Sequence, residues 1–276
     1  MYEIESGNLK FAIIHTAFEI GTKKRNIEKV NQLLEKITRR GEQIDFVILP
    51  QMLNGVAMYE NVARKTGKSI KNVGEKIPGE LSEELIATSS RYNVGVIAGP
   101  ILERRGSRLY RSVMIVLDGE LRAVLRQVFA EKNIGSYKGV PYADLGSIKV
   151  GVLIAEDVLY PDIALFFSLA KPHILIVFPS LDKGLEEQLA LAKARAIECG
   201  CVAIFVGGTF TYRHEILSAI PTVVVDENGA NIEFVGETDE KILILNIKKR
   251  ESLAGSISDK ERFKFIKYML RFIRKA

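Results

Sequence analysis

Mostly apolar runs of strand length alternate with amphipathic segments along the first hundred residues. Leu9–Thr16 is a short apolar run typical of a buried strand, whereas Lys23–Arg39 places its apolar residues three or four positions apart, as a helix does. The alternation continues with a strand expected at Phe46–Pro50, a helix at Leu81–Tyr92 and a strand at Gly95–Gly99. This β-α-β-α-β order predicts an α/β fold in which helices cover a sheet.

The pattern becomes rich in β-formers in the middle of the chain. Tyr110–Leu117 and Leu121–Phe129 flank Asp118-Gly119, which is a strong hairpin signal, and Ala130–Gly146 is predicted to be a loop. Further strands are expected at Ile148–Ala155, Ile174–Phe178, Val202–Val206, Thr222–Val225, Asn231–Val235 and Lys241–Ile247, and helices at Pro161–Ala170, Leu185–Glu198 and Asp259–Lys275. No linker interrupts this order, so we predict one domain over residues 1–247 and an extension over residues 248–276.

The basic character of the chain is concentrated in this extension. The net charge of the whole chain is +5, but residues 248–276 carry ten basic and three acidic residues, so the other 247 residues are slightly acidic. The helix expected at Asp259–Lys275 combines these charges with a wide apolar stripe, which normally packs against protein. We therefore expect the extension to dock on the body or on a dimer mate. Binding to nucleic acid or to a membrane surface is the less favoured alternative.

The remaining composition points to a cytoplasmic protein. No apolar stretch reaches the length of a spanning helix, and residues 1–9 do not resemble a signal peptide. Only two cysteines occur, Cys199 and Cys201, which excludes a disulfide framework and favours buried structural thiols. The low number of glutamines, five, leans towards a heat-adapted source.

Several segments together resemble one family. Each is a predicted strand end, hairpin or helix with a distinctive residue sequence. The segments are Phe46–Gln51, Leu109–Ser112, Leu125–Phe129, Val150–Asp157, Tyr160–Asp162, Phe178–Ser180 and Ala194–Glu198. Their order and spacing resemble the nitrilase superfamily of carbon–nitrogen hydrolases over about residues 8–246. The resemblance implies a four-layer α-β-β-α sandwich that usually dimerises through one helical layer, so we expect a homodimer or higher homo-oligomer.

The same resemblance identifies three positions for the family's chemistry. Its members attack a nitrile or amide carbon with a cysteine, use a glutamate as general base and use a lysine to stabilise the oxyanion. By their neighbours, the glutamate position is Gln51, the lysine position is Gln127 and the cysteine position is Ala155. An alanine has no atom that can attack carbon, and neither glutamine can take or supply the charge, so we expect a pseudoenzyme.

Replacing both charged residues by glutamine keeps the site neutral, and two amides are able to satisfy each other. We expect a binding or scaffold protein whose ligand, if it has one, is a small neutral amide held by Gln51 and Gln127 beside Ala155 and Glu156. Arg111 stands where the family usually has asparagine, and a local ion pair with Glu156 is the favoured interpretation of this cation.

Two alternative functions remain open. A relocated catalytic set would use Glu131 or Lys132, although a nucleophile would still be missing. The extension provides the second alternative, an electrostatic binding module.

The three histidines, His15, His173 and His214, have no metal-ligand spacing. We therefore expect satisfied side chains at the first two, and no metal or other cofactor.

Overall fold

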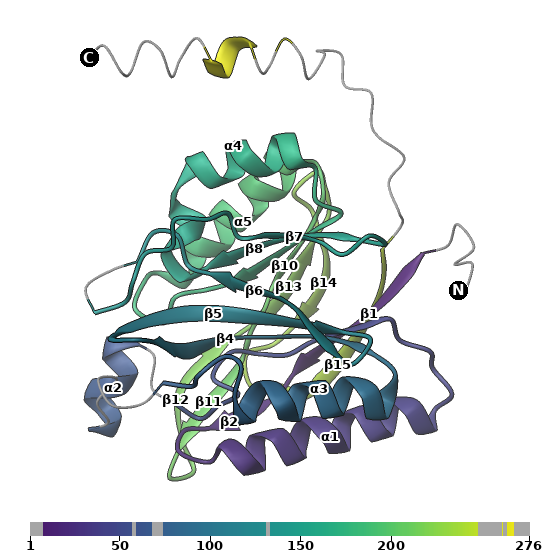
Figure 1. Cartoon of the computed structure of the whole chain (residues 1–276), viewed down its shortest axis with the longest axis vertical. Helices are drawn as coiled ribbons and strands as arrows, with labels where there is room; N and C mark the ends of the chain where they lie inside the picture. The colour runs from purple at the N-terminus through teal and green to yellow at the C-terminus, as the bar shows by residue number, and fades with distance from the viewer. Residues whose placement is uncertain are drawn as a thin grey trace.

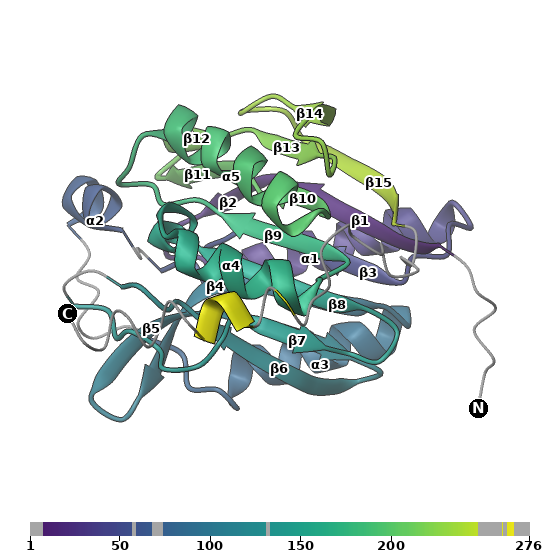
Figure 2. The same ribbon diagram turned by 90° about the horizontal axis from the view of Figure 1, so that it is seen from above.

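The computed structural model describes residues 8–56, 59–67, 74–130, 133–247, 261 and 264–267. Two six-stranded sheets stack face to face, and helices cover both outer faces (Figure 1). Seen from above, the helices α4 (Pro161–Ala170) and α5 (Leu185–Cys199) lie together over one sheet (Figure 2). The four layers of helix, sheet, sheet and helix confirm the predicted α-β-β-α sandwich.

The first sheet has the strand order β15-β1-β3-β4-β5-β6. Its strands are β1 (Leu9–His15), β3 (Phe46–Ile48), β4 (Gly95–Arg105), β5 (Arg108–Leu117), β6 (Glu120–Arg126) and β15 (Lys241–Ile247). The central strands β1, β3 and β4 are parallel, and the flanking pairs are antiparallel. Helices α1 (Lys23–Arg39) and α3 (Glu80–Tyr92) cover its outer face (Figure 1).

The second sheet has the order β14-β13-β10-β9-β8-β7, with β8, β9 and β10 parallel. Its strands are β7 (Tyr142–Asp144), β8 (Lys149–Ile154), β9 (Ile174–Phe178), β10 (Val202–Phe205), β13 (Thr222–Val225) and β14 (Asn231–Val235). A short 3₁₀ helix, η2 (Ala155–Leu159), follows β8 directly. Each sheet therefore has parallel central strands. The C-terminal ends of these strands lie together at one edge of their sheet.

Strand alternation divides the core into two parts. On β1, Phe11 and Ile13 belong to the cluster between the sheets, whereas Ala12 and Ile14 face the cluster under α1 and α3. All four side chains are fully buried. Because successive side chains of a strand point to opposite faces, a strand covered on both faces must be apolar throughout. This explains why the predicted central strands were continuous apolar runs.

Some elements differ from the sequence-based expectation. β4 continues to Arg105 instead of ending at Gly99, because a register shift between Ala98 and Ile101 accommodates Pro100 within the strand. β7 lies inside the segment that we expected to be only a loop. The predicted hairpin turn is confirmed, since Asp118 and Gly119 both have positive φ angles, 54° and 69°.

Three further strands and one helix were missed. The strands β2 (Ala17–Glu19), β11 (Gly208–Tyr212) and β12 (Glu215–Ile220) form a small third sheet, and α2 (Glu60–Thr66) follows the loop after β3. The turn between β11 and β12 has Arg213 and His214 at positive φ, where Gly, Asn or Asp usually stands. The sequence therefore carries no signal of this turn.

Most of the C-terminal extension lies outside the described residues, including most of the helix predicted at Asp259–Lys275. Within it, residues 264–267 are helical, and Phe265 is 62% exposed. Docking of the extension on the body or on a second copy therefore stays a prediction.

Candidate functional site

The three positions assigned to the family's chemistry lie at strand ends on one edge of the sandwich. Gln51 comes three residues after the end of β3, Gln127 directly follows β6 and Ala155 directly follows β8. All three residues are fully buried. The three residues therefore follow strand ends of both sheets at one edge of the sandwich.

Arg111, Gln127 and Glu156 form a hydrogen-bonded cluster at this site. Arg111 Nη1 donates to Glu156 Oε2 at 2.9 Å and to Gln127 Oε1 at 3.1 Å, and Gln127 Nε2 donates to Glu156 Oε2 at 2.6 Å. Only 4% of each charged side chain is exposed. The expected local ion pair is thus present, and it joins the strand β5 to the turn after β8.

Gln51 has a separate set of partners. Its Nε2 donates to the Pro179 carbonyl at 3.1 Å, and its Oε1 accepts from the Tyr59 hydroxyl at 2.8 Å. Burial raises the pKa of Tyr59, so the hydroxyl keeps its proton and remains a donor. The guanidinium of Arg111 lies over the Tyr59 ring, 4.4 Å from its centroid. Tyr59 therefore connects Gln51 to the charged cluster.

The expectation that the two glutamines satisfy each other is wrong. Gln51 uses both of its polar atoms on Tyr59 and Pro179. Gln127 uses its amide on Arg111, Glu156 and the Phe129 carbonyl. The physical reason is that a buried ion pair is present, and charged partners form stronger hydrogen bonds than a second neutral amide.

Sequence analysis also missed Tyr59. It lies eight residues beyond Gln51, in a segment with no regular pattern of its own. Its one signal is chemical, since a buried tyrosine usually finds a partner for its hydroxyl.

The turn that carries Ala155 has an unusual backbone. Ala155 has a φ angle of +52°, a left-handed conformation that is costly for a residue with a Cβ. The Asp157 carboxylate holds this turn, because it accepts from the backbone N–H groups of Val128, Phe129 and Ile154. Burial raises the pKa of Asp157 to about 7, and these donors oppose the rise. The sharp turn after β8 is therefore fixed to the end of β6.

Comparison with known proteins agrees with this geometry. The carbon–nitrogen hydrolase family matches residues 12–252 of the chain. The chain belongs to this family.

Individual relatives are distant. An omega-amidase of Arabidopsis thaliana is 27% identical over 55% of this chain and 44% of its own length. A nitrilase of Pyrococcus abyssi is 26% identical over 60% of this chain and 63% of its own length, so the chain matches less than two thirds of both relatives. The crystal structure of Nit3 from Saccharomyces cerevisiae has a TM-score of 0.74 at 19% identity and covers 90% of this chain and 92% of that one.

The site combines positioned polar groups with an alanine, Ala155, at the position assigned to the nucleophile of carbon–nitrogen hydrolases. Ala155 offers only a methyl group, and the carboxylate of Glu156 is engaged through Oε2. Its other oxygen, Oε1, is buried and has no hydrogen-bond partner within the part of the chain that the structure describes. The arrangement can therefore hold charge and accept one further hydrogen bond. Glu131 and Lys132, considered as a relocated catalytic set, lie outside the described residues.

The other candidate residues have structural partners. His15 is buried, with Nδ1 2.8 Å from Thr222 Oγ1, and burial lowers its pKa. His173 Nδ1 accepts from the Lys149 N–H at 2.9 Å. Both cysteines are buried thiols outside any disulfide, as expected. Within the described ranges, no three His, Cys, Asp or Glu side chains gather as a metal ion would require, and no helix there has the length and apolarity to span a membrane.

Proposed function

We propose that this member of the carbon–nitrogen hydrolase family does not hydrolyse C–N bonds and acts as a binding or scaffold protein. The observation that carries the proposal is that the site combines Ala155, at the position assigned to the nucleophile, with a buried ion pair between Arg111 and Glu156. The position assigned to the nucleophile has none, and the ion pair is hydrogen-bonded to the amide at the position assigned to the lysine. Losing one member of a concerted catalytic set already removes several orders of magnitude in rate.

The test is ammonia release from a panel of amides, nitriles and N-carbamoyl compounds. We expect no release by the native chain beyond a buffer blank. Turnover by the native chain would refute the proposal and favour a relocated catalytic set.

The matched variant for this test restores the family's three catalytic side chains, and the structure indicates one further change that it needs. Gln51→Glu, Gln127→Lys and Ala155→Cys return the three family side chains, but a lysine at 127 would lie beside Arg111, whose Nη1 is 3.1 Å from the present Gln127 Oε1. The restored variant should therefore also carry Arg111→Asn, the family's usual residue there. Activity in this variant, with silence in the native chain, would locate the loss in these side chains.

A small amide is the ligand that we propose for this same site. Gln51 and Gln127 already use their polar atoms on the protein, so the acceptor for a ligand N–H is Glu156 Oε1. Acetamide and propionamide should raise the melting temperature of the native chain, and acetate should not. Glu156→Gln should abolish the shift, because an amide at 156 no longer offers an anionic acceptor. Absence of any shift with the native chain would refute this ligand class.

A further inference from the structure

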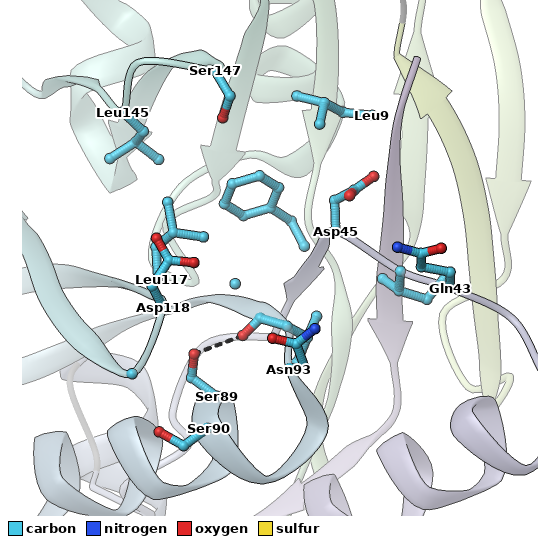
Figure 3. A pocket seen from close by; sticks show the side chains of 15 residues that line it. Leu9, Gln43, Asp45, Ser89, Ser90, Asn93, Leu117, Asp118, Leu145 and Ser147 are labelled. Atoms are coloured by element: carbon cyan, nitrogen blue, oxygen red, sulfur yellow. Dashed lines mark hydrogen bonds between the residues drawn. The ribbon is translucent and has the colours of Figure 1, made fainter. Parts of the chain in front are cut away.

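A large cavity lies at the end of the sandwich opposite the candidate site. Its volume is about 670 Å³, within the range of small-molecule sites, and it lies where β3 and β4 begin. Four structural segments surround it: the loop before β3, the C-terminal end of α3, the turn after β5 and the turn after β7. Figure 3 shows Ser147 on one side of the cavity and Ser89 and Asn93 on the other.

Among the residues that the structure describes, the charged side chains that line the cavity are acidic. Asp45 and Asp118 are among the fifteen lining residues, and that set contains no Lys, Arg or His. Asp45 is partly buried, and its Oδ2 accepts from the Lys10 backbone N–H at 2.7 Å. Asp118 is exposed and lies 3.4 Å from Arg122, an exposed pair that solvent screens strongly. Asp45 is thus the anchoring charge, and Asp118 adds negative charge at the rim.

The end of α3 adds to this negative potential. The last carbonyls of a helix lack intrahelical donors and carry a partial negative charge, which favours a cation. The turn carrying Asp118 is held against this helix end, since a Cβ on Gly119 would lie 2.5 Å from Ser90 Oγ. Two carboxylates and a helix C-terminus therefore converge on one cavity.

Apolar side chains complete the lining. Phe46 lies over Gly95, where an added Cβ would be only 2.5 Å from the ring, and Leu9, Leu117 and Leu145 also line the cavity. The Phe46 ring and the leucines favour an apolar body. A ligand that matches this lining has a positive end and a hydrocarbon portion.

We propose that this cavity binds a small organic cation, namely a primary amine with an apolar body. The ammonium group contacts the Asp45 carboxylate near the end of α3, and the hydrocarbon portion lies among Phe46 and the leucines. The site uses none of the residues of the candidate catalytic edge, so it stands whether or not the chain hydrolyses C–N bonds.

The test is calorimetric titration of the full chain with hexylamine, with hexan-1-ol and hexanoate as neutral and anionic analogues. Hexylamine should bind saturably and at least about tenfold more tightly than either analogue. Hexan-1-ol replaces the charge-assisted hydrogen bond to Asp45 by a neutral one, and the carboxylate of hexanoate is repelled by Asp45. Raising the salt concentration should weaken the binding of hexylamine.

Two variants separate this site from general attraction to an acidic surface. Asp45→Asn should weaken hexylamine binding about tenfold, whereas Asp162→Asn, which removes an exposed charge from α4, should leave it unchanged. Both variants should melt as the native chain does to within a few degrees, which a circular dichroism scan checks. Equal binding of hexan-1-ol, or equal weakening by the two variants, would overturn the proposal, as would the absence of saturable binding.

Discussion

The buried ion pair between Arg111 and Glu156 gives the sharpest test of the site. Its two side chains are each 4% exposed and their charged atoms lie 2.9 Å apart. The perturbation is a double-mutant cycle with Arg111→Met, Glu156→Gln and the two changes together. Each single change leaves one charge buried without its partner, and the double change removes both charges.

The magnitudes follow from the contacts. Two unit charges at this separation attract by about 6 kcal/mol at an effective dielectric constant of about 20, before the cost of desolvation. Breaking a buried pair from one side costs about 3–5 kcal/mol. We expect Arg111→Met near the upper end, because Glu156 then keeps only the Gln127 amide at 2.6 Å on Oε2. Glu156→Gln should cost less, because Arg111 keeps Gln127 and the face of Tyr59.

The double variant should lose no more than about 2 kcal/mol, since it leaves no buried charge at this pair. The coupling energy is then about 3 kcal/mol or more, which is typical of residues in direct contact. The assay is urea unfolding followed by circular dichroism, with the native chain and all three variants at pH 7.

Arg39→Met supplies the control, because its 2.6 Å pair with Glu35 is exposed and should contribute less than about 0.5 kcal/mol. Additive effects of the two site changes, or single changes no larger than the control, would refute the view that this pair is a desolvated part of the site.

Three further predictions concern the two ends of the sandwich. Ala155→Val should lower the free energy of unfolding by about 2 kcal/mol or more, since a β-branched residue is strained at a φ of +52° in a fully buried position. Ala155→Gly should change the free energy of unfolding by less than about 1 kcal/mol. Equal urea midpoints for the two variants would contradict this. Burial raises the pKa of Asp157 to about 7, so the folded state holds this proton more tightly than the unfolded state, and the resulting stabilisation at low pH is lost as the pH rises through 7. The native chain should therefore lose stability relative to Asp157→Asn between about pH 4 and pH 7 by about 2–4 kcal/mol, and a pH-independent difference would disprove the shift. Gly95→Ala should cost about 1–3 kcal/mol, because its Cβ would lie 2.5 Å from Phe46 Cδ1. Gly184→Ala should be nearly neutral by thermal melting, because the nearest atom to its Cβ would be 3.8 Å away.

Strong local patterns determined most of the fold. The helix at Lys23–Arg39 and the strands at Ile174–Phe178 and Lys241–Ile247 were predicted with the bounds that the structure shows. These segments carry their own evidence, namely helical spacing of apolar residues in the first and β-rich apolar patterns in the other two. Short elements lack such evidence: the strands β2 and β7 have three residues each, too few to display an alternation, and the seven residues of α2 make only about two helical turns.

The candidate site was assigned from the family resemblance together with local residue patterns. The resemblance assigned Gln51, Gln127 and Ala155 to strand ends, and the structure brings these ends to one edge of the sandwich. It also favoured the ion pair between Arg111 and Glu156, which are 45 residues apart.

The sequence by itself therefore determined which side chains occupy the three positions assigned to the family's chemistry, and it left Tyr59 unnoticed. Only the tertiary structure decided how those side chains pair. Gln127 bonds to Arg111 and Glu156, and Gln51 bonds to Tyr59 and Pro179, because packing two sheets together selects the partners within hydrogen-bond reach. The cavity that includes Asp45 and Asp118 has the same origin, since its lining comes from segments far apart in the chain. Local sequence patterns reflect interactions between near neighbours, and the distances between side chains of different layers are set only when those layers pack.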